Sequence, residues 1–329
     1  MQQTILTKKD IRQAADVLKS VDRRTPLIKS FYLCALTHGE VYLKPENLQL
    51  TGSFKFRGAY NKIASLSDAD KAKGVIGCSA GNHAQGVALS AKLQGIKAII
   101  VMPTTAPQAK VDATKSYGAE VVLVGDTFDE CKEACMKMVE ETGTTFLHPY
   151  DDAKVIAGQG TIGIEILEDL YDVDTVIVPV GGGGLIAGVS VALKTFNPNI
   201  TIIGVQSENI HGMKASFDAK ALTKHFTAPT IADGCAVAYP GSMTFEIVQE
   251  LVDVMVTVSE DQIELGMKNL LQRSKLLVEG SGALSVAAIQ SGKIDAYVKD
   301  KKVVAILSGG NVDLERVSHI CDYYTKRDI

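Results

Sequence analysis

Short apolar runs recur along the chain, and segments with helical spacing separate many of them. The apolar run 75–78 leads into a helical segment at Asn82, and the run 98–102 ends at Pro103. Strands that alternate with helices are typical of parallel sheets with right-handed crossovers, so the pattern predicts an α/β fold. The expected strands are 41–44, 75–78, 98–102, 120–124, 144–147, 175–180, 200–206, 254–258 and 303–307.

Helix starts can also be recognised in the sequence. Thr7 with Asp10 and Ser259 with Gln262 have the spacing of capping pairs, and further helices are expected at 129–141 and 162–170. The alternation pauses near Asp152 and then resumes. We therefore expect two open parallel-sheet domains: a small one at 67–152, and a large one that is discontinuous, at 1–66 and 153–329.

Composition narrows the classes of protein. The chain has 329 residues, of which 46% are hydrophobic and 22% charged, with a net charge of −4. This balance is typical of a globular protein and gives no broad attraction to nucleic acid or to anionic membranes. The uncharged stretch 176–193 approaches the length of a membrane span, but Pro179 and four glycines favour a strand, a loop and a buried helix instead.

The cysteines and the amino terminus bear on the cellular compartment. The six cysteines form no Cys-x-x-Cys pair and no spacing typical of zinc ligands, so we expect free thiols and no metal site. Lys8, Lys9 and Asp10 bring charges to the amino terminus, where a secretory signal would need an apolar stretch. Both features lead us to expect a cytoplasmic protein.

Lys55 is the residue with the most informative surroundings. It lies in residues 53–59, Ser-Phe-Lys-Phe-Arg-Gly-Ala, just inside an expected helix start and between two aromatic rings. Partial desolvation there would lower the pKa of its amine and leave the amine nucleophilic, able to form a Schiff base. A solvated helix lysine is the ordinary alternative, and only the neighbouring motifs argue against it.

A run of four glycines, Gly181, Gly182, Gly183 and Gly184, follows an expected strand and opens an expected helix. Backbone N–H groups there can bind a phosphate. Two cofactors fit the run. Gly182, Gly184 and Ala187 also satisfy a dinucleotide fingerprint, which would indicate an NAD-dependent oxidoreductase. Lys55, and a Ser308 hydroxyl at another strand end, favour pyridoxal phosphate, because a dinucleotide site explains neither.

Together with these motifs, residues 79–86, Ser-Ala-Gly-Asn-His-Ala-Gln-Gly, and residues 232–234, Ala-Asp-Gly, give the chain a clear resemblance. It resembles the serine/threonine dehydratase family of fold-type II pyridoxal-phosphate enzymes, most closely the short catabolic threonine dehydratases. The resemblance extends from Thr25 to Asn311. It implies the tryptophan synthase β-like fold, with the cofactor between two domains. It also implies conversion of L-threonine to 2-oxobutanoate and ammonia, and of L-serine to pyruvate.

The resemblance also implies roles for individual residues. Lys55 would bind the cofactor covalently and act as the catalytic base. Glu279 would lie near the cofactor, although a carboxylate at a helix start explains it equally well. The expected cofactor-binding residues are Phe54, Lys55, Asn82, Gly181, Gly182, Gly183, Gly184, Leu185, Gly234 and Ser308. The expected substrate-binding residues are Ser79, Ala80, Gly81, Asn82 and His83.

Departures from related activities are equally informative. Racemases of this family have a serine where this chain has Ala80, and they bind a metal through carboxylates where it has Gln206 and Gly212. Both departures argue against racemase activity and against that metal site, and serine racemase stays only as the alternative. The chain ends soon after Asn311, so we expect no amino-acid-sensing domain. Catabolic relatives are activated by AMP and assemble as dimers or tetramers, and the resemblance implies both here.

Overall fold

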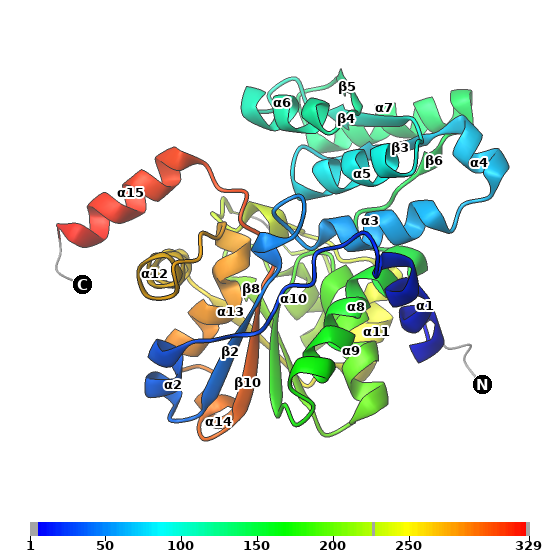
Figure 1. Cartoon of the computed structure of the whole chain (residues 1–329). Coiled ribbons are helices and arrows are strands. Elements are labelled where there is room, and N and C mark those ends of the chain that lie inside the picture. The colour runs from blue at the N-terminus through cyan, green and yellow to red at the C-terminus, as the bar shows by residue number, and fades with distance from the viewer. Residues whose placement is uncertain (1–5, 226–227, 327–329) are drawn as a thin grey trace.

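The structure is a computed structural model that describes residues 6–225 and 228–326. Two β-sheets organise the described part of the chain (Figure 1). We call the six-stranded sheet with its helices the large unit, and the four-stranded sheet with its helices the small unit. Among the described residues, no helix is both long and apolar enough to cross a membrane.

The large sheet has the strand order β1-β2-β10-β7-β8-β9. Its first strands come from the start of the chain, and β2 pairs with β10 in parallel, with Glu40 opposite Lys302. The strands are β1 (Ile28–Lys29), β2 (Glu40–Pro45), β7 (Thr175–Pro179), β8 (Thr201–Ser207), β9 (Val254–Val258) and β10 (Lys302–Leu307). One detail corrects the expected all-parallel sheet, because β1 pairs antiparallel with β2. This edge strand of two residues carries no detectable pattern.

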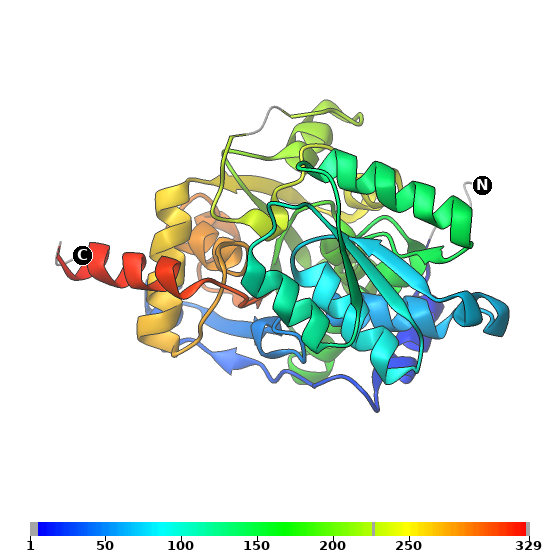
Figure 2. The same cartoon turned by 90° about the horizontal axis from the view of Figure 1, so that it is seen from above.

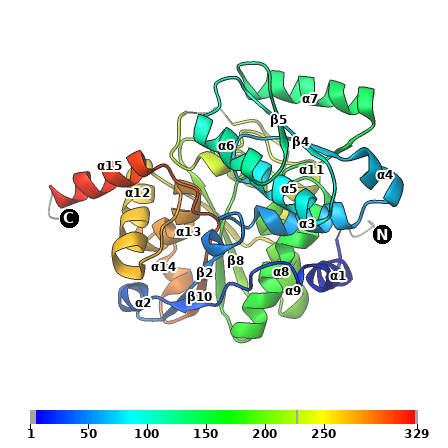
Figure 3. The ribbon, with the colours of Figure 1, turned by 45° about the horizontal axis from the view of Figure 1, so that its top comes forward.

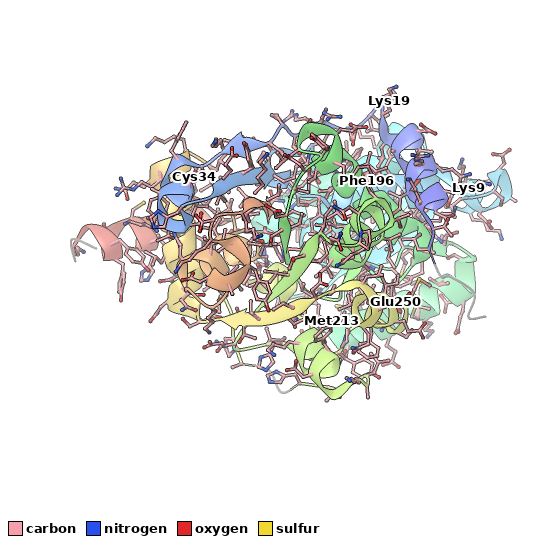
Figure 4. All side chains as sticks on the ribbon, turned by 90° about the horizontal axis from the view of Figure 1, so that it is seen from below. Lys9, Lys19, Cys34, Phe196, Met213 and Glu250 are labelled. Carbon is pink, nitrogen blue, oxygen red and sulfur yellow. The ribbon has the colours of Figure 1, made fainter. Side chains whose placement is uncertain are left out.

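Helices cover both faces of the large sheet. α8 (Ala153–Asp169), α9 (Gly184–Phe196) and α11 (Ser242–Leu251) lie on one face; α2 (Phe31–Thr37), α12 (Glu260–Asn269) and α13 (Gly280–Gln290) lie on the other. Figure 4 shows Phe196 of α9 and Glu250 of α11 on one side and Cys34 of α2 on the opposite side. Along β10, Val303 and Ala305 pack in one apolar cluster and Val304 and Ile306 in another, so the sheet is buried on both faces.

The small sheet has the order β5-β4-β3-β6, and all its pairs are parallel. Its strands are β3 (Val75–Cys78), β4 (Ala98–Met102), β5 (Glu120–Leu123) and β6 (Thr145–Phe146). α5 (Asn82–Leu93) and α6 (Gln108–Ser116) pack together, and α7 (Phe128–Thr142) packs against β3 and β4. Figure 2 shows this unit from above.

One helix, α3 (Lys55–Ala64), lies between the two units (Figures 1 and 3). It packs against α5 of the small unit and α8 of the large unit. The remaining α-helices are α1 (Lys8–Leu18), α4 (Asp68–Lys73), α10 (Gly212–Ala219), α14 (Asp295–Val298) and α15 (Leu314–Thr325), and short 3-10 helices lie at Glu46–Leu48 and Asp233–Cys235. Figure 1 shows α15 projecting beyond α12, the helix that it contacts.

The structure confirms the nine expected strands, with end shifts of a residue or two, and both capping pairs. The helix expected at 162–170 begins earlier, at Ala153. Its start is fixed by the Asp152 side chain, which accepts hydrogen bonds from the N–H groups of Lys154 and Val155. A π-helical turn at Leu270–Ser274, which no pattern predicted, follows α12.

Candidate active site

A cavity of about 1050 Å³ is lined by residues of both units. The helices and strands bring all the candidate site residues together around it, although they are scattered over more than 250 positions of the chain. The candidates that line it are Phe54, Lys55, Ser79, Ala80, Gly81, Asn82, His83, Gly181, Gly182, Gly183, Gly184, Leu185, Gly234, Glu279 and Ser308.

Strand order explains why the loops converge. In each sheet the order reverses once, between β10 and β7 in the large sheet and between β3 and β6 in the small one. Ligands of open parallel sheets bind at the carboxyl ends of the strands where the order reverses. The four glycines follow β7 and Ser308 follows β10, while residues 79–83, which we call the loop 79–83, run from the end of β3 into the first turn of α5. All three segments therefore meet at such points.

Lys55 is the first residue of α3, and part of its side chain faces the cavity. Its Nζ donates a hydrogen bond to the carbonyl oxygen of Pro149 at 2.9 Å and lies 5.3 Å from the centre of the Phe54 ring. Desolvation lowers the pKa of the amine to about 8, and weaker effects of Cys235 and Glu279 act in the opposite direction. A substantial fraction of the amine is therefore neutral near pH 8, as a nucleophile requires.

The four glycines form the turn from β7 into α9. Gly183 has φ +99°, a conformation that side chains disfavour, and α9 begins without a side-chain cap. A Cβ at Gly182 would lie 2.4 Å from the Tyr150 ring, so that close approach also requires glycine. Thr244 steadies the turn by donating its hydroxyl proton to the Gly182 carbonyl at 2.6 Å. The uncapped N–H groups at the start of α9 suit a phosphate.

The loop 79–83 gives the cavity a second helix start without a side-chain cap, at α5. The Ser79 hydroxyl accepts a hydrogen bond from the Gly81 N–H at 3.2 Å, and the space beside Gly81 is open. His83 lies at the same loop, with its Nε2 2.9 Å from the Leu147 carbonyl oxygen. Burial lowers the pKa of His83 to about 3, so the ring is neutral and donates that hydrogen bond.

Asn82 joins the two units through its side chain. It donates to Glu279 Oε1 at 2.7 Å and accepts from Asn311 Nδ2 at 2.7 Å. Glu279 is the N-cap residue of α13, but its carboxyl group makes no capping bond and faces Asn82 instead. Burial, reinforced by the charge of Asp233, raises the pKa of Glu279 to about 8.

Ser308 lies next to the start of α3, where its carbonyl oxygen accepts a hydrogen bond from the Phe54 N–H at 3.1 Å. Its hydroxyl lines the cavity and has no hydrogen-bond partner within 6–225 and 228–326. Gly234 lies beside Glu279, since a Cβ there would be 3.3 Å from Oε1. A ligand with polar atoms would complete this group.

Comparison with known proteins decides between the two cofactors that the glycine run left open. The chain matches the family described as "Pyridoxal-phosphate dependent enzyme" over residues 18–309, most of its length. It belongs to the pyridoxal-phosphate-dependent enzymes. Its cofactor is therefore pyridoxal phosphate, and the choice between this cofactor and a dinucleotide, which the glycine run alone left open, is settled.

Relatives of this pyridoxal-phosphate-dependent enzyme agree on the fold. The "L-threonine dehydratase catabolic TdcB" of Staphylococcus aureus (strain N315) is 60% identical over 321 residues, which cover 97% of this chain and 93% of that protein. Threonine deaminase isoform 2 from Solanum lycopersicum superposes with a TM-score of 0.88 at 40% identity, covering 95% and 93% of the two chains. Serine racemase from Dictyostelium discoideum gives 0.89 at 37% identity, covering 94% and 99%. These matches confirm the fold-type II architecture.

The side chains fit the cofactor of this pyridoxal-phosphate-dependent enzyme. A phosphate needs N–H donors, which the uncapped start of α9 offers beside Gly183. An aldehyde reacts with a nucleophilic amine such as that of Lys55, and a pyridine nitrogen can accept a hydrogen bond from a hydroxyl such as that of Ser308.

Several cavity residues were missed from the sequence. Tyr150 and Gln159 line the cavity, and so does Cys235, beside Gly234. Tyr150 follows β6 in the run His-Pro-Tyr-Asp-Asp, and its position at a strand end was the available signal. Gln159 lies within α8, and its role became visible only through its hydrogen bond to the Gly58 N–H at 3.1 Å.

Proposed function

We propose that this enzyme is a threonine dehydratase that converts L-threonine to 2-oxobutanoate and ammonia, and L-serine to pyruvate, in amino-acid degradation. The feature of the structure that carries the proposal is the partly neutral Lys55 amine in a cavity with two uncapped helix starts. One start suits the cofactor phosphate and the other a substrate carboxylate. The name of the relative at 60% identity supports the same activity.

Bound pyridoxal phosphate supplies an aldehyde that links covalently to amines and a ring that withdraws electrons from the substrate Cα. The N–H groups that follow Gly183 would bind its phosphate, and the Ser308 hydroxyl would donate to its ring nitrogen. Asn82 would contact the cofactor from the small unit, with Phe54, Leu185 and Gly234 around it.

The chain's own residues then divide the work of elimination. The loop 79–83 would bind the substrate carboxylate through the N–H groups at the start of α5, and so orient Cα. Lys55 would remove the Cα proton, for which an amine with a pKa of about 8 is well matched. Glu279, whose raised pKa keeps it largely protonated at neutral pH, would hold Asn82 in place.

Serine racemisation is the second candidate, because serine racemase structures superpose closely. Racemisation needs a proton donor on the face of the substrate opposite Lys55. Ala80 offers a methyl group at the loop position where racemases have serine. This residue favours elimination over racemisation.

Assembly and regulation are proposed on the resemblance alone. We expect a cytoplasmic homodimer or homotetramer activated by AMP, and domain boundaries at 1–66 with 153–329 and at 67–152, which the division into two sheets supports. Sedimentation with and without AMP tests the assembly, and threonine turnover with and without AMP tests the activation. Unchanged mass and unchanged activity would remove AMP from the proposal.

The activity itself is tested with the purified holoenzyme and L-threonine, by following the formation of 2-oxobutanoate. Ammonia should appear in equal amount. A yellow protein that binds pyridoxal phosphate but forms neither product from threonine or serine would refute the proposed reaction, although not the cofactor.

A further inference from the structure

Arg57 is fully buried only two residues after Lys55 on α3. Side chains two positions apart on a helix point in nearly opposite directions. Lys55 therefore faces the cavity, while Arg57 points away from it into the large unit. A buried guanidinium is costly unless carboxylates surround it, and here they do.

The guanidinium binds three carboxylates. Nε and Nη2 donate to the two oxygens of Glu46 at 2.8 and 2.9 Å, a bidentate pair. Nη1 donates to Glu165 Oε1 at 2.6 Å and to Asp22 Oδ2 at 2.7 Å. These partners come from the turn after β2, from α8, and from the segment between α1 and β1.

A second buried cation completes the group. Lys44 of β2 donates to Glu165, and also to the carbonyl oxygen of Thr25 at 2.6 Å. We call Asp22, Lys44, Glu46, Arg57 and Glu165 the Arg57 cluster. Its charges are three carboxylates and two cations. Burial raises the pKa of Asp22. At Glu46 burial acts in the same direction, but Arg57, Lys44 and Thr25 together outweigh it and hold the pKa of that carboxyl below its usual value.

The start of α3 depends on contacts from outside the helix. Its N-cap residue, Phe54, makes no side-chain capping bond. The helix start is held instead by Ser308, which accepts from the Phe54 N–H, by Gln159, and by the Arg57 cluster. All of these partners belong to the large unit, which also carries the glycine turn.

The small unit touches the same helix differently. A Cβ at Gly86 of α5 would lie 3.0 Å from the carbonyl carbon of Lys55, so the two backbones are in close contact. Two hydrogen bonds from this side add to the packing, from the Ser90 hydroxyl to the Phe56 carbonyl oxygen at 3.4 Å and from the Gln94 amide to the Tyr60 carbonyl oxygen at 3.2 Å, but the contact between α5 and α3 includes no ion pair. The charged anchors of α3 thus connect it to the unit that holds the glycines and Ser308.

We propose that the Arg57 cluster positions Lys55. It fixes the first turn of α3 and so holds the Lys55 Nζ at a constant place relative to the four glycines and Ser308. Stability alone does not require such a cluster, because apolar replacements of buried ion pairs are often neutral or stabilising. Burial is the main cause of the lowered pKa of Lys55, and the titratable groups that act on it, Cys235 and Glu279, lie outside the cluster, so the cluster acts on Lys55 through its position.

Two variants test the proposal. Glu165→Gln removes the negative charge and one of the two Glu165 oxygens that accept hydrogen bonds from Arg57, but it leaves two carboxylates and two cations, so it should fold. Arg57→Lys keeps the charge and loses the bidentate pair. The control is Arg24→Met, because Arg24 also pairs with two carboxylates of α8, Glu168 and Asp169 at 2.5 Å each, but its side chain is 51% exposed.

The first measurement is the rate at which hydroxylamine releases the cofactor from the holoenzyme. A displaced Lys55 exposes its bond to the cofactor, so release should become about tenfold faster in both variants. The second measurement is turnover of L-threonine, and this part alone rests on the proposed function. We expect kcat to fall about 10- to 100-fold while KM changes little, because the loop 79–83, which would bind the substrate carboxylate, is unchanged.

Urea unfolding of each protein separates position from stability. The proposal is overturned if folded Glu165→Gln releases cofactor and turns over threonine as the unmodified enzyme does, or if the loss of activity only tracks the unfolded fraction. Should Arg57→Lys fail to fold, Glu165→Gln decides. If the unmodified enzyme does not turn over threonine, the proposed function fails, and hydroxylamine release still decides the positioning role.

Discussion

Two fully buried glutamates, Glu46 and Glu279, have opposite electrostatic surroundings, which gives a prediction with an internal control. Glu46 is bound by Arg57. Glu279 accepts a hydrogen bond from Asn82 and lies near the charge of Asp233. Replacing each by glutamine should therefore change the free energy of unfolding in opposite directions.

For Glu279 the magnitude follows from its pKa, raised from 4.5 to about 8. Between pH 4.5 and about pH 8, Glu279 is protonated in the folded, cofactor-free protein but ionised in the unfolded chain. Stability is therefore lost as the pH rises, by 1.36 kcal/mol per pH unit, up to about 5 kcal/mol above pH 8. Glutamine cannot ionise and keeps an oxygen for Asn82. Glu279→Gln should gain less than about 1 kcal/mol at pH 5 and several kcal/mol at pH 8.5.

For Glu46 the sign is reversed. Arg57 holds its pKa below the usual value, so its contribution is present above pH 4.5 and lost as the pH falls through the folded-state pKa. Glu46→Gln leaves part of a buried guanidinium unpaired. It should cost about 3–5 kcal/mol at pH 7, with the gap closing in acid.

Urea unfolding of the cofactor-free proteins, followed by circular dichroism at pH 5, 6, 7 and 8.5, measures both effects. Glu168→Gln serves as the control, because that side chain is 54% exposed, and it should stay within about 0.5 kcal/mol. A stability difference for Glu279→Gln that is the same at every pH, or a destabilisation, would refute the reasoning about its burial.

Three further changes address the site. Lys55→Ala should lower the rate of 2-oxobutanoate formation more than about 1000-fold, since it removes the nucleophile and the base, and retained turnover would contradict both roles. Gly183→Ala should weaken cofactor affinity about tenfold in a spectroscopic titration, because φ is +99° and the added Cβ would lie 2.5 Å from Met213 Cε; unchanged affinity would argue against this turn as the phosphate site. Ala80→Ser should yield detectable D-serine from L-serine by chiral chromatography, whereas abundant D-serine from the unmodified enzyme would favour racemase activity.

The elements that could be predicted are those whose pattern is local. The strands 75–78, 98–102 and 254–258 match the structure to the residue, because each is a short, mostly apolar run with a polar residue, glycine or proline on either side. The antiparallel β1 could not be predicted, since two residues carry no period. The early start of α8 could be predicted from Asp152, whose side chain caps the helix, whereas the prediction at 162–170 covered only the second half of the helix.

The site was predictable where chemistry and local sequence coincide, as in the lysine turn and the four glycines. The Arg57 cluster was not, because five charged residues from four segments meet only after folding. In the sequence, Arg57 is simply the next polar residue after Lys55. The same applies to Glu279, whose raised pKa comes from burial and from Asp233 rather than from its sequence neighbours.

The pairing of β2 with β10 has a consequence for how the chain folds as the ribosome makes it. Glu40 lies opposite Lys302, so β2 can pair with β10 only after about 260 further residues have been synthesised. At 5–20 residues per second this takes roughly 10–50 s. The small sheet, built from 75–146, can form during that interval. Lys55 and Ser308 meet only at the end of synthesis, so a nascent chain released early would carry the lysine without the strand end that completes its site.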